Sequence, residues 1–154
     1  MPHHVHASHR IVVAAPIDQA FMFFTPAGEE LWVDGWQPTY LNPADGRTEA
    51  GMVFTTGEGA DHTIWLMADF DRAQHRSRYL RCTPGSRTGT VEVRCRALDA
   101  ARTEVEVSYA LTALSPAGAE ALQAFEGERF AEMIDGWGQE IAARRATLLT
   151  AQIR

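Results

Sequence analysis

Clusters of Gly, Pro and Asp interrupt the chain about every ten residues between positions 40 and 115. The runs between these clusters are rich in Val, Thr and aromatic residues, and several alternate between apolar and polar side chains. Short runs of this kind, joined by turn residues, are typical of antiparallel strands that follow one another as a meander. We therefore predict strands at 39–41, 52–56, 61–69, 76–83, 88–98 and 103–114, preceded by a first strand at 5–14.

Charge predicts how the last two of these strands pair. With a turn centred on Ala100, Arg94 lies opposite Glu106 and Arg96 lies opposite Glu104 on one face of the hairpin. The other face then pairs Val91 with Tyr109, Val93 with Val107 and Cys95 with Val105. A slip of one residue would place charges opposite valines, so we expect one solvated and one covered face.

The neighbouring strand at 76–83 has two possible phases. Pairing Arg81 with Glu92 on the outer face turns Arg78 and Cys82 inward, whereas the opposite phase turns Tyr79 inward. We predict the first phase, which places Arg78 beneath the C-terminal helix; the alternative is a solvated arginine. A guanidinium inside would need a carboxylate partner or an anionic group of a ligand.

Two short helices are predicted after the first strand. Apolar residues recur at three- and four-residue spacing over 17–24, which indicates a helix with one apolar face. Thr25 can cap a second helix that begins at Pro26, and Asp34-Gly35 provides a stop.

Ser115-Pro116 repeats this start, and helix-forming residues continue to about position 150. At about 1.5 Å per residue, one helix of that length crosses a whole sheet. Its apolar stripe contains Leu122, Phe125, Phe130, Met133, Ile134, Trp137, Ile141 and Leu148. Gly127, Gly136 and Gly138 weaken this helix and leave room for loose packing.

Composition excludes several function classes. The 154 residues suffice for a single domain, 1–154, and 20 acidic against 14 basic residues leave a net charge of −6, which disfavours nucleic-acid binding. Every basic residue is arginine, so Schiff-base chemistry and a Walker A phosphate loop are excluded. No apolar run predicts membrane insertion, and no signal-peptide core follows the N-terminus, so we expect a cytoplasmic protein.

Cysteines and histidines offer little recognisable chemistry. Cys82 and Cys95 lie within predicted strands without metal-ligand spacing, which favours buried free thiols. His62 and His75 are the histidines beyond the N-terminal segment, and both are expected to be exposed. His4 and His6 could bind a metal weakly, but no metal site and no cofactor are predicted.

Three segments carry a resemblance to a known family: IVVAAPIDQAFMFFTPAGEELWVDGWQP at 11–38, RYLRCTPGSRTGTVEVRCRAL at 78–98 and YALTALSPAG at 109–118. Together with the order of elements, they resemble a bacterial branch of the SRPBCC superfamily. That superfamily includes START lipid-transfer domains, birch pollen allergen relatives, aromatic polyketide cyclases and Hsp90-activator-like proteins. The resemblance covers nearly the whole chain. It implies an α+β helix-grip fold, in which a curved antiparallel sheet of about seven strands wraps around a long C-terminal helix and encloses a cavity.

Bulky side chains are predicted to point into this cavity, where they either line a space for a ligand or fill a core. The predicted ligand-binding residues are Trp32, Trp36, Phe54, Trp65, Met67, Arg78, Tyr109, Phe130, Met133 and Trp137. The expected partner is a hydrophobic or amphipathic small molecule, held for binding or transport.

Two other functions remain open. The first is an enzyme of cyclase, dehydratase or hydrolase type, in which Arg78, Tyr109 or His62 would move protons. The second is an Hsp90-activator-like interaction module, with Ile64 and Leu66 in an outward patch that could also form a homodimer contact.

Overall fold

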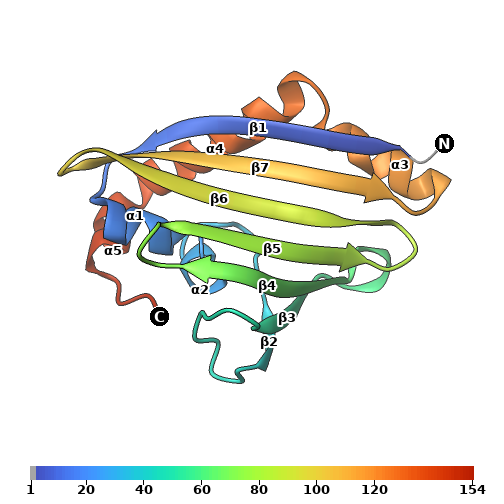
Figure 1. Ribbon diagram of the computed structural model, residues 1–154, viewed down its shortest axis with the longest axis horizontal. Coiled ribbons are helices and arrows are strands. Elements are labelled where there is room, and N and C mark those ends of the chain that lie inside the picture. Colours follow the sequence, from blue (N-terminus) through green and yellow to red (C-terminus); the bar gives the residue numbers. More distant parts are fainter. Residues whose placement is uncertain (1–2) are drawn as a thin grey trace.

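A computed structural model describes residues 3–154 of the chain. One antiparallel sheet of seven strands runs in the order β1-β7-β6-β5-β4-β3-β2 (Figure 1). Its strands are β1 (His4–Val13), β2 (Thr39–Asn42), β3 (Val53–Thr56), β4 (Thr63–Asp71), β5 (Arg76–Thr83), β6 (Arg87–Asp99) and β7 (Arg102–Ala113). The predicted meander is therefore confirmed, and the first strand, β1, forms one edge of the sheet beside β7.

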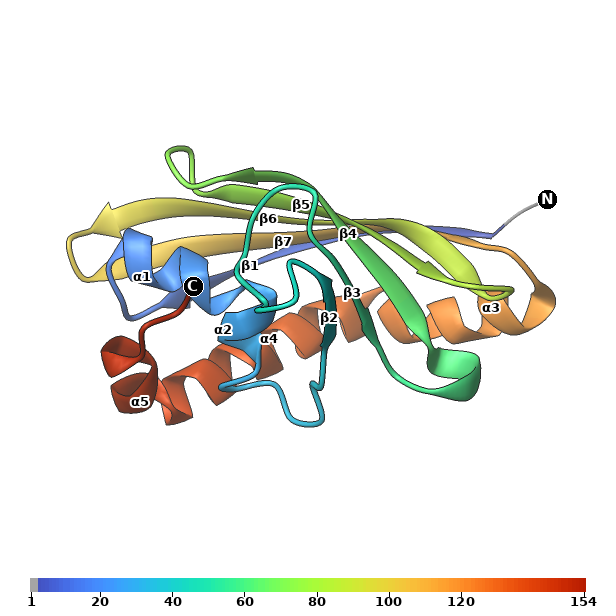
Figure 2. The same cartoon turned by 90° about the horizontal axis from the view of Figure 1, so that it is seen from below.

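The helices α1 to α5 all lie on one side of this sheet, as the side view in Figure 2 shows. They are α1 (Ile17–Phe23), α2 (Pro26–Glu29), α3 (Pro116–Leu122), α4 (Glu128–Ala143) and α5 (Arg145–Thr150), with 3-10 turns η1 (Gly59–Asp61) and η2 (Gln123–Phe125). The α+β helix-grip architecture is confirmed. The core lies between the helices and the covered face of the sheet.

Both predicted N-caps are confirmed. The Thr25 hydroxyl accepts a hydrogen bond from the Gly28 N–H at 3.1 Å, and the Ser115 hydroxyl accepts one from Gly118 at 3.0 Å. The helix after Thr25 is shorter than predicted and ends at Glu29 instead of residue 34. The chain folds back after it because the Trp36 Nε1–H donates to the Pro26 carbonyl at 3.0 Å.

The C-terminal segment is broken, whereas a single helix was predicted. Glu126 has an extended backbone and Gly127 has a positive φ of 58°, a conformation that favours glycine, so α3 and η2 end before α4 begins. A second break at Arg144 separates α4 from α5. Leu122, Phe130, Ile134, Ile141 and Leu148 of the predicted apolar stripe are nevertheless buried.

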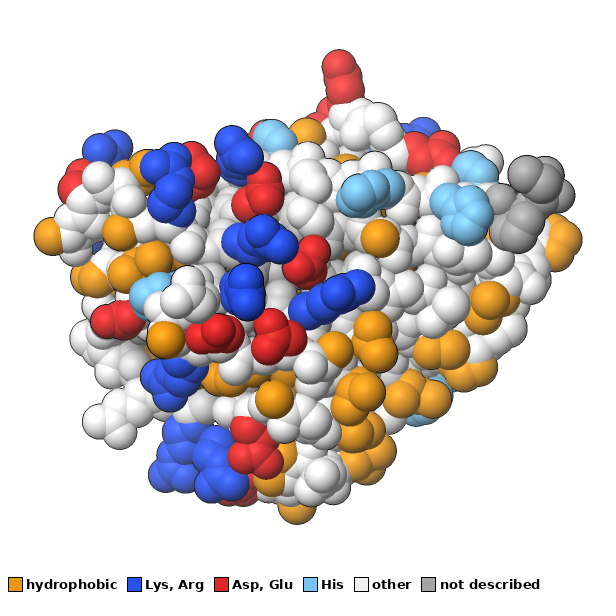
Figure 3. All heavy atoms as spheres, in the orientation of Figure 1, with side chains coloured by type: hydrophobic (Ala, Val, Ile, Leu, Met, Phe, Trp, Pro, Cys, Tyr) orange, Lys and Arg blue, Asp and Glu red, His pale blue; other side chains and the backbone are white. Residues whose placement is uncertain are grey.

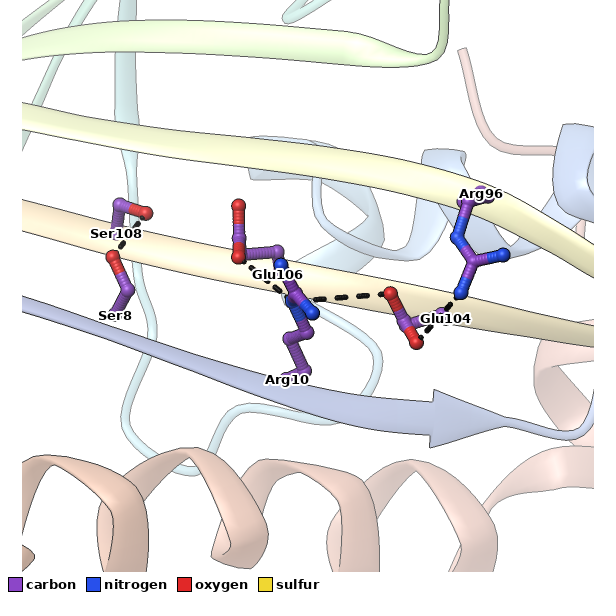
Figure 4. A network of polar contacts seen from close by, with 6 residues as sticks. All are labelled: Ser8, Arg10, Arg96, Glu104, Glu106 and Ser108. Carbon is purple, nitrogen blue, oxygen red and sulfur yellow. Dashed lines mark hydrogen bonds and ion pairs between the residues drawn. The ribbon is translucent and has the colours of Figure 1, made fainter.

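The predicted register of β6 and β7 is confirmed at every pair named above. On the outer face, β1 joins this pair and extends its charge pattern (Figure 4). The Arg10 Nε–H donates to Glu106 at 2.8 Å, and Arg96 donates to Glu104 at 3.1 Å. The outer face of these strands is therefore a solvated ion-pair surface.

The predicted phase of β5 is wrong. Arg78 is exposed on the outer face, where its register neighbours are Asp69 and Glu92, while Tyr79 lies buried on the inner face. Outside, the guanidinium keeps its water and faces two carboxylates, whereas inside it would lose that hydration. The Tyr79 hydroxyl has a partner inside, because it donates to the Phe24 carbonyl at 2.8 Å.

Candidate functional site

A cavity of about 120 Å³ lies between the inner face of the sheet and the elements that cover it. Its walls come from α2, the segment after α2, strands β4 to β7 and helix α4. The residues that line it are Glu29, Val33, Trp36, Trp65, Tyr79, Arg81, Val91, Val93, Tyr109 and Trp137. The tryptophans therefore do not fill this space completely.

Aromatic rings form one wall of the cavity and are held in fixed orientations. The ring centroids of Trp36 and Trp65 lie 5.8 Å apart, and those of Trp65 and Tyr79 lie 5.9 Å apart. Phe54 stacks behind Trp65 at 5.6 Å. The Trp65 Nε1–H donates to the Thr56 hydroxyl at 3.0 Å, so this indole has little freedom to turn. The wall is therefore aromatic, and the orientation of its central indole is fixed by that hydrogen bond.

The structure separates the predicted site residues into three groups. Trp36, Trp65, Tyr109 and Trp137 line the cavity. Trp32, Phe54, Met67 and Phe130 are buried in the core outside the lining, and Met133 of α4 is half-buried away from it. Arg78 lies on the opposite face of the sheet, which corrects its predicted role.

On β5, Arg81 points inward. Its guanidinium carbon lies 4.6 Å from the centroid of the Trp65 ring, within the range of a cation–π interaction. The Nε atom is buried and has no hydrogen-bond partner, and no carboxylate of residues 3–154 forms an ion pair with this side chain. Burial lowers the pKa of Arg81 from its ordinary value.

Two further polar groups at the cavity form no side-chain hydrogen bond within residues 3–154. No hydrogen bond of those residues uses the Glu29 carboxyl or the Tyr109 hydroxyl, whereas Tyr79 is bonded to the backbone of Phe24. Burial raises the pKa of Glu29 well above the ordinary value, and it raises the pKa of Tyr109 to about 12. At neutral pH, the cavity thus presents a neutral tyrosine and a carboxyl that resists ionisation.

Glu29 and Arg81 were not among the predicted site residues. Arg81 follows directly from the correct phase of β5, because it lies two residues from the inward Tyr79. Glu29 occupies the first turn of α2, where an acidic residue is expected for reasons of helix electrostatics alone. Its place at the cavity depends on how α2 packs against the sheet, which no local pattern indicates.

The histidines lie away from the cavity. His62 is exposed, as predicted, and its ring lies 3.4 Å from the Gly57 carbonyl. His75 is partly buried instead of exposed, because its Nε2 pairs with Asp18 at 2.7 Å. On β1, His9 pairs with Asp135 of α4 at 2.7 Å. No group of three or more His, Cys, Asp and Glu side chains in the described part of the chain is placed to hold a metal ion.

The outer face of the sheet carries apolar residues beyond the ion-pair surface (Figure 3). Ile64 and Leu66 of β4 are exposed there, which is the condition that the interaction-module alternative requires, and Leu80 of β5 lies directly opposite Leu66. This patch is separate from the cavity because successive side chains of a strand point to opposite faces. Within residues 3–154, no helix has both the length and the apolarity to cross a membrane.

Solved structures share this architecture. Norcoclaurine synthase from Thalictrum flavum, in complex with dopamine and hydroxybenzaldehyde, matches 92% of this chain and 88% of its own with a TM-score of 0.64 at 10% identity. An aromatase/cyclase from a Streptomyces species matches 94% and 96% with a TM-score of 0.64 at 21% identity. Ara h 8.0201 matches 97% and 100% with a TM-score of 0.63 at 12% identity.

These likenesses confirm, at the level of the fold, the resemblance that the sequence carries. No protein-family model matches the chain, and no curated protein matches it.

Proposed function

We propose that the protein binds a small, apolar, ring-shaped molecule in the cavity between the sheet and helix α4. The observation that carries this proposal is a partly open space of about 120 Å³ lined by five aromatic side chains, two of which, Trp36 and Trp65, have ring centroids 5.8 Å apart. An apolar cavity of roughly 150 Å³ is known to hold benzene, whereas pockets for drug-sized ligands measure roughly 300–1,000 Å³. One ring fits this size class, and a fused polycyclic chain does not.

The comparison structures support a cavity-binding role. The norcoclaurine synthase structure contains dopamine and hydroxybenzaldehyde, each of which has one aromatic ring. Its identity to this chain is 10%, so it supports the fold and assigns no ligand.

Thermal-shift measurements with toluene, phenol and indole test the proposal, because a ligand that binds only the folded state raises the melting temperature. We expect at least one of the three to do so. Val91→Phe, which adds a ring to the cavity lining, is expected to abolish the shift, and Leu80→Phe on the outer face is the matched control. Absence of any shift in the wild type, or an equal shift in Val91→Phe, contradicts the proposal.

A second candidate function is catalysis, favoured by the uncommitted Glu29 carboxyl at the cavity. Because burial raises the pKa of Glu29, this carboxyl holds a proton that it can donate to a bound molecule. Tyr109 remains a candidate donor, while Arg78 and His62 lie outside the cavity and lose that role. Exchange of the α-hydrogens of acetophenone in deuterated water, followed by NMR, tests this activity. Glu29→Gln is expected to abolish the enzyme-dependent exchange.

A further inference from the structure

A second inward arginine lies next to Arg81. Arg87 begins β6 in the same alternation as the buried Val91 and Val93, so it belongs to the inner face. In the register of β5 and β6, Arg81 lies opposite Gly89 and Arg87 lies opposite Thr83. The two arginines are therefore diagonal neighbours on adjacent strands, a separation that long side chains bridge.

Neither arginine has an anionic partner among residues 3–154. The Nε atoms of both are buried without a hydrogen-bond partner. The Nη1 atom of Arg87 donates a hydrogen bond to the Ser86 hydroxyl at 3.0 Å. No ion pair within the described residues involves either side chain. The charge of Arg87 is close enough to contribute to the lowered pKa of Arg81.

Gly89 occupies the inward position between Arg87 and Val91, and a Cβ atom there would lie 1.9 Å from the Ala110 carbonyl oxygen of β7, so the two backbones approach closely between the arginines. The buried Nε atoms of Arg81 and Arg87 each lack an acceptor, and an oxyanion held by the two guanidiniums would supply one. Arg81 also lines the ring-sized cavity, so the oxyanion and the ring can belong to one molecule.

We propose that Arg81 and Arg87 form an oxyanion-binding site at the β5–β6 end of the cavity, and that the ligand is a single-ring aromatic acid with a carboxylate or phosphate group. This inference rests on the proposed binding function and specifies its ligand. Glu29, the acidic residue in the cavity lining, does not oppose an anion while it is protonated, and burial favours that form.

Calorimetric titration with benzoate, phenyl phosphate and benzyl alcohol tests this assignment on the full chain. Benzyl alcohol has the ring and lacks the charge, and the two anions distinguish a carboxylate from a phosphate. We expect the better anion to bind about tenfold or more tightly than benzyl alcohol, because a hydrogen bond to a charged group contributes that order of free energy.

Arg81→Gln and Arg87→Gln are each expected to remove this preference while benzyl alcohol still binds. Arg81→Lys is expected to retain part of it, since the charge remains and the planar fork is lost. Arg78→Gln, on the outer face of the same strand, is the matched control and is expected to leave all three affinities unchanged. Circular dichroism verifies that each variant is folded.

The outcomes separate the two proposals. If both anions bind the wild type no better than benzyl alcohol, or if Arg78→Gln lowers anion binding as much as Arg81→Gln does, the oxyanion site is wrong and the cavity proposal stands. If neither the anions nor benzyl alcohol nor the neutral panel above binds, the cavity proposal fails and this inference fails with it.

Discussion

Two arginines three residues apart on β5 show how different the two faces of the sheet are. Arg78 is exposed among carboxylates on the outer face, and Arg81 lies among aromatic rings on the inner face. The outer charge is exposed and forms no ion pair within residues 3–154, so we expect its replacement to change the free energy of unfolding little. The inner charge lacks a counter-ion within residues 3–154, and its Nε atom is buried without a hydrogen-bond partner, so we expect it to lower the stability of the empty protein. One residue type is thus exposed on one face and lies among aromatic rings on the other.

The largest expected difference between the faces concerns packing. Met67 and Leu66 are consecutive residues of β4 with exposed fractions of 0% and 37%. Met67→Ala is expected to lower the free energy of unfolding by about 2–5 kcal/mol, and Leu66→Ala by roughly 1 kcal/mol or less. Urea denaturation of both variants measures this. Equal losses would show that the outer patch is covered in solution, for instance by a second copy of the chain.

A smaller difference of opposite sign is expected for the two arginines. Arg81→Met is expected to raise the free energy of unfolding by about 1–2 kcal/mol, because it removes an uncompensated buried charge and keeps an apolar stem in place. Arg78→Met is expected to change that free energy by less than about 0.5 kcal/mol. Both are measured by urea denaturation without added anions. A loss of stability in Arg81→Met would mean that its cation–π contact with Trp65 outweighs desolvation.

The smallest expected effect is a pH slope. Because burial raises the pKa of Glu29, the folded chain holds this proton more tightly than the unfolded chain does. The free energy of unfolding therefore falls as pH rises from the ordinary glutamate range through the higher folded pKa of Glu29. Glu29→Gln is expected to flatten this slope and to be more stable than the wild type at neutral pH. Exposed Glu58→Gln is the control, and a slope unchanged in Glu29→Gln would show that this carboxyl titrates normally.

Much of the fold could be predicted from local patterns. The alternation of valines and charged residues fixed the β6–β7 register because a slip of one residue exposes every valine. Thr25-Pro26 and Ser115-Pro116 marked helix starts because a cap hydroxyl and an N-terminal proline act within one turn. The break at Gly127 was missed because glycine lowers helix stability in any position, and only the packing of α3 and α4 decides whether the helix stops there.

The candidate site was predicted less well, and β5 shows why. Its segment RSRYLRCT has polar or charged residues in both phases, so alternation does not identify the inner face. Which face of β5 points inward depends on residues of other elements. Glu92 of β6 lies opposite Arg78, and the Phe24 carbonyl accepts a hydrogen bond from the Tyr79 hydroxyl. Four of the ten predicted residues line the cavity, and the other six do not. The sequence does not separate the two groups, because large aromatic residues occur in cores and in pockets alike.

Gly118 holds the start of α3 close to the sheet, apart from helix α4. A Cβ atom at this position would lie 1.8 Å from the Ser86 carbonyl oxygen, so the start of α3 rests directly on the turn that precedes Arg87. Helix α4, which carries Trp137, begins only after the kink at Gly127. The roof of the cavity and its charged end are consequently separate pieces of backbone.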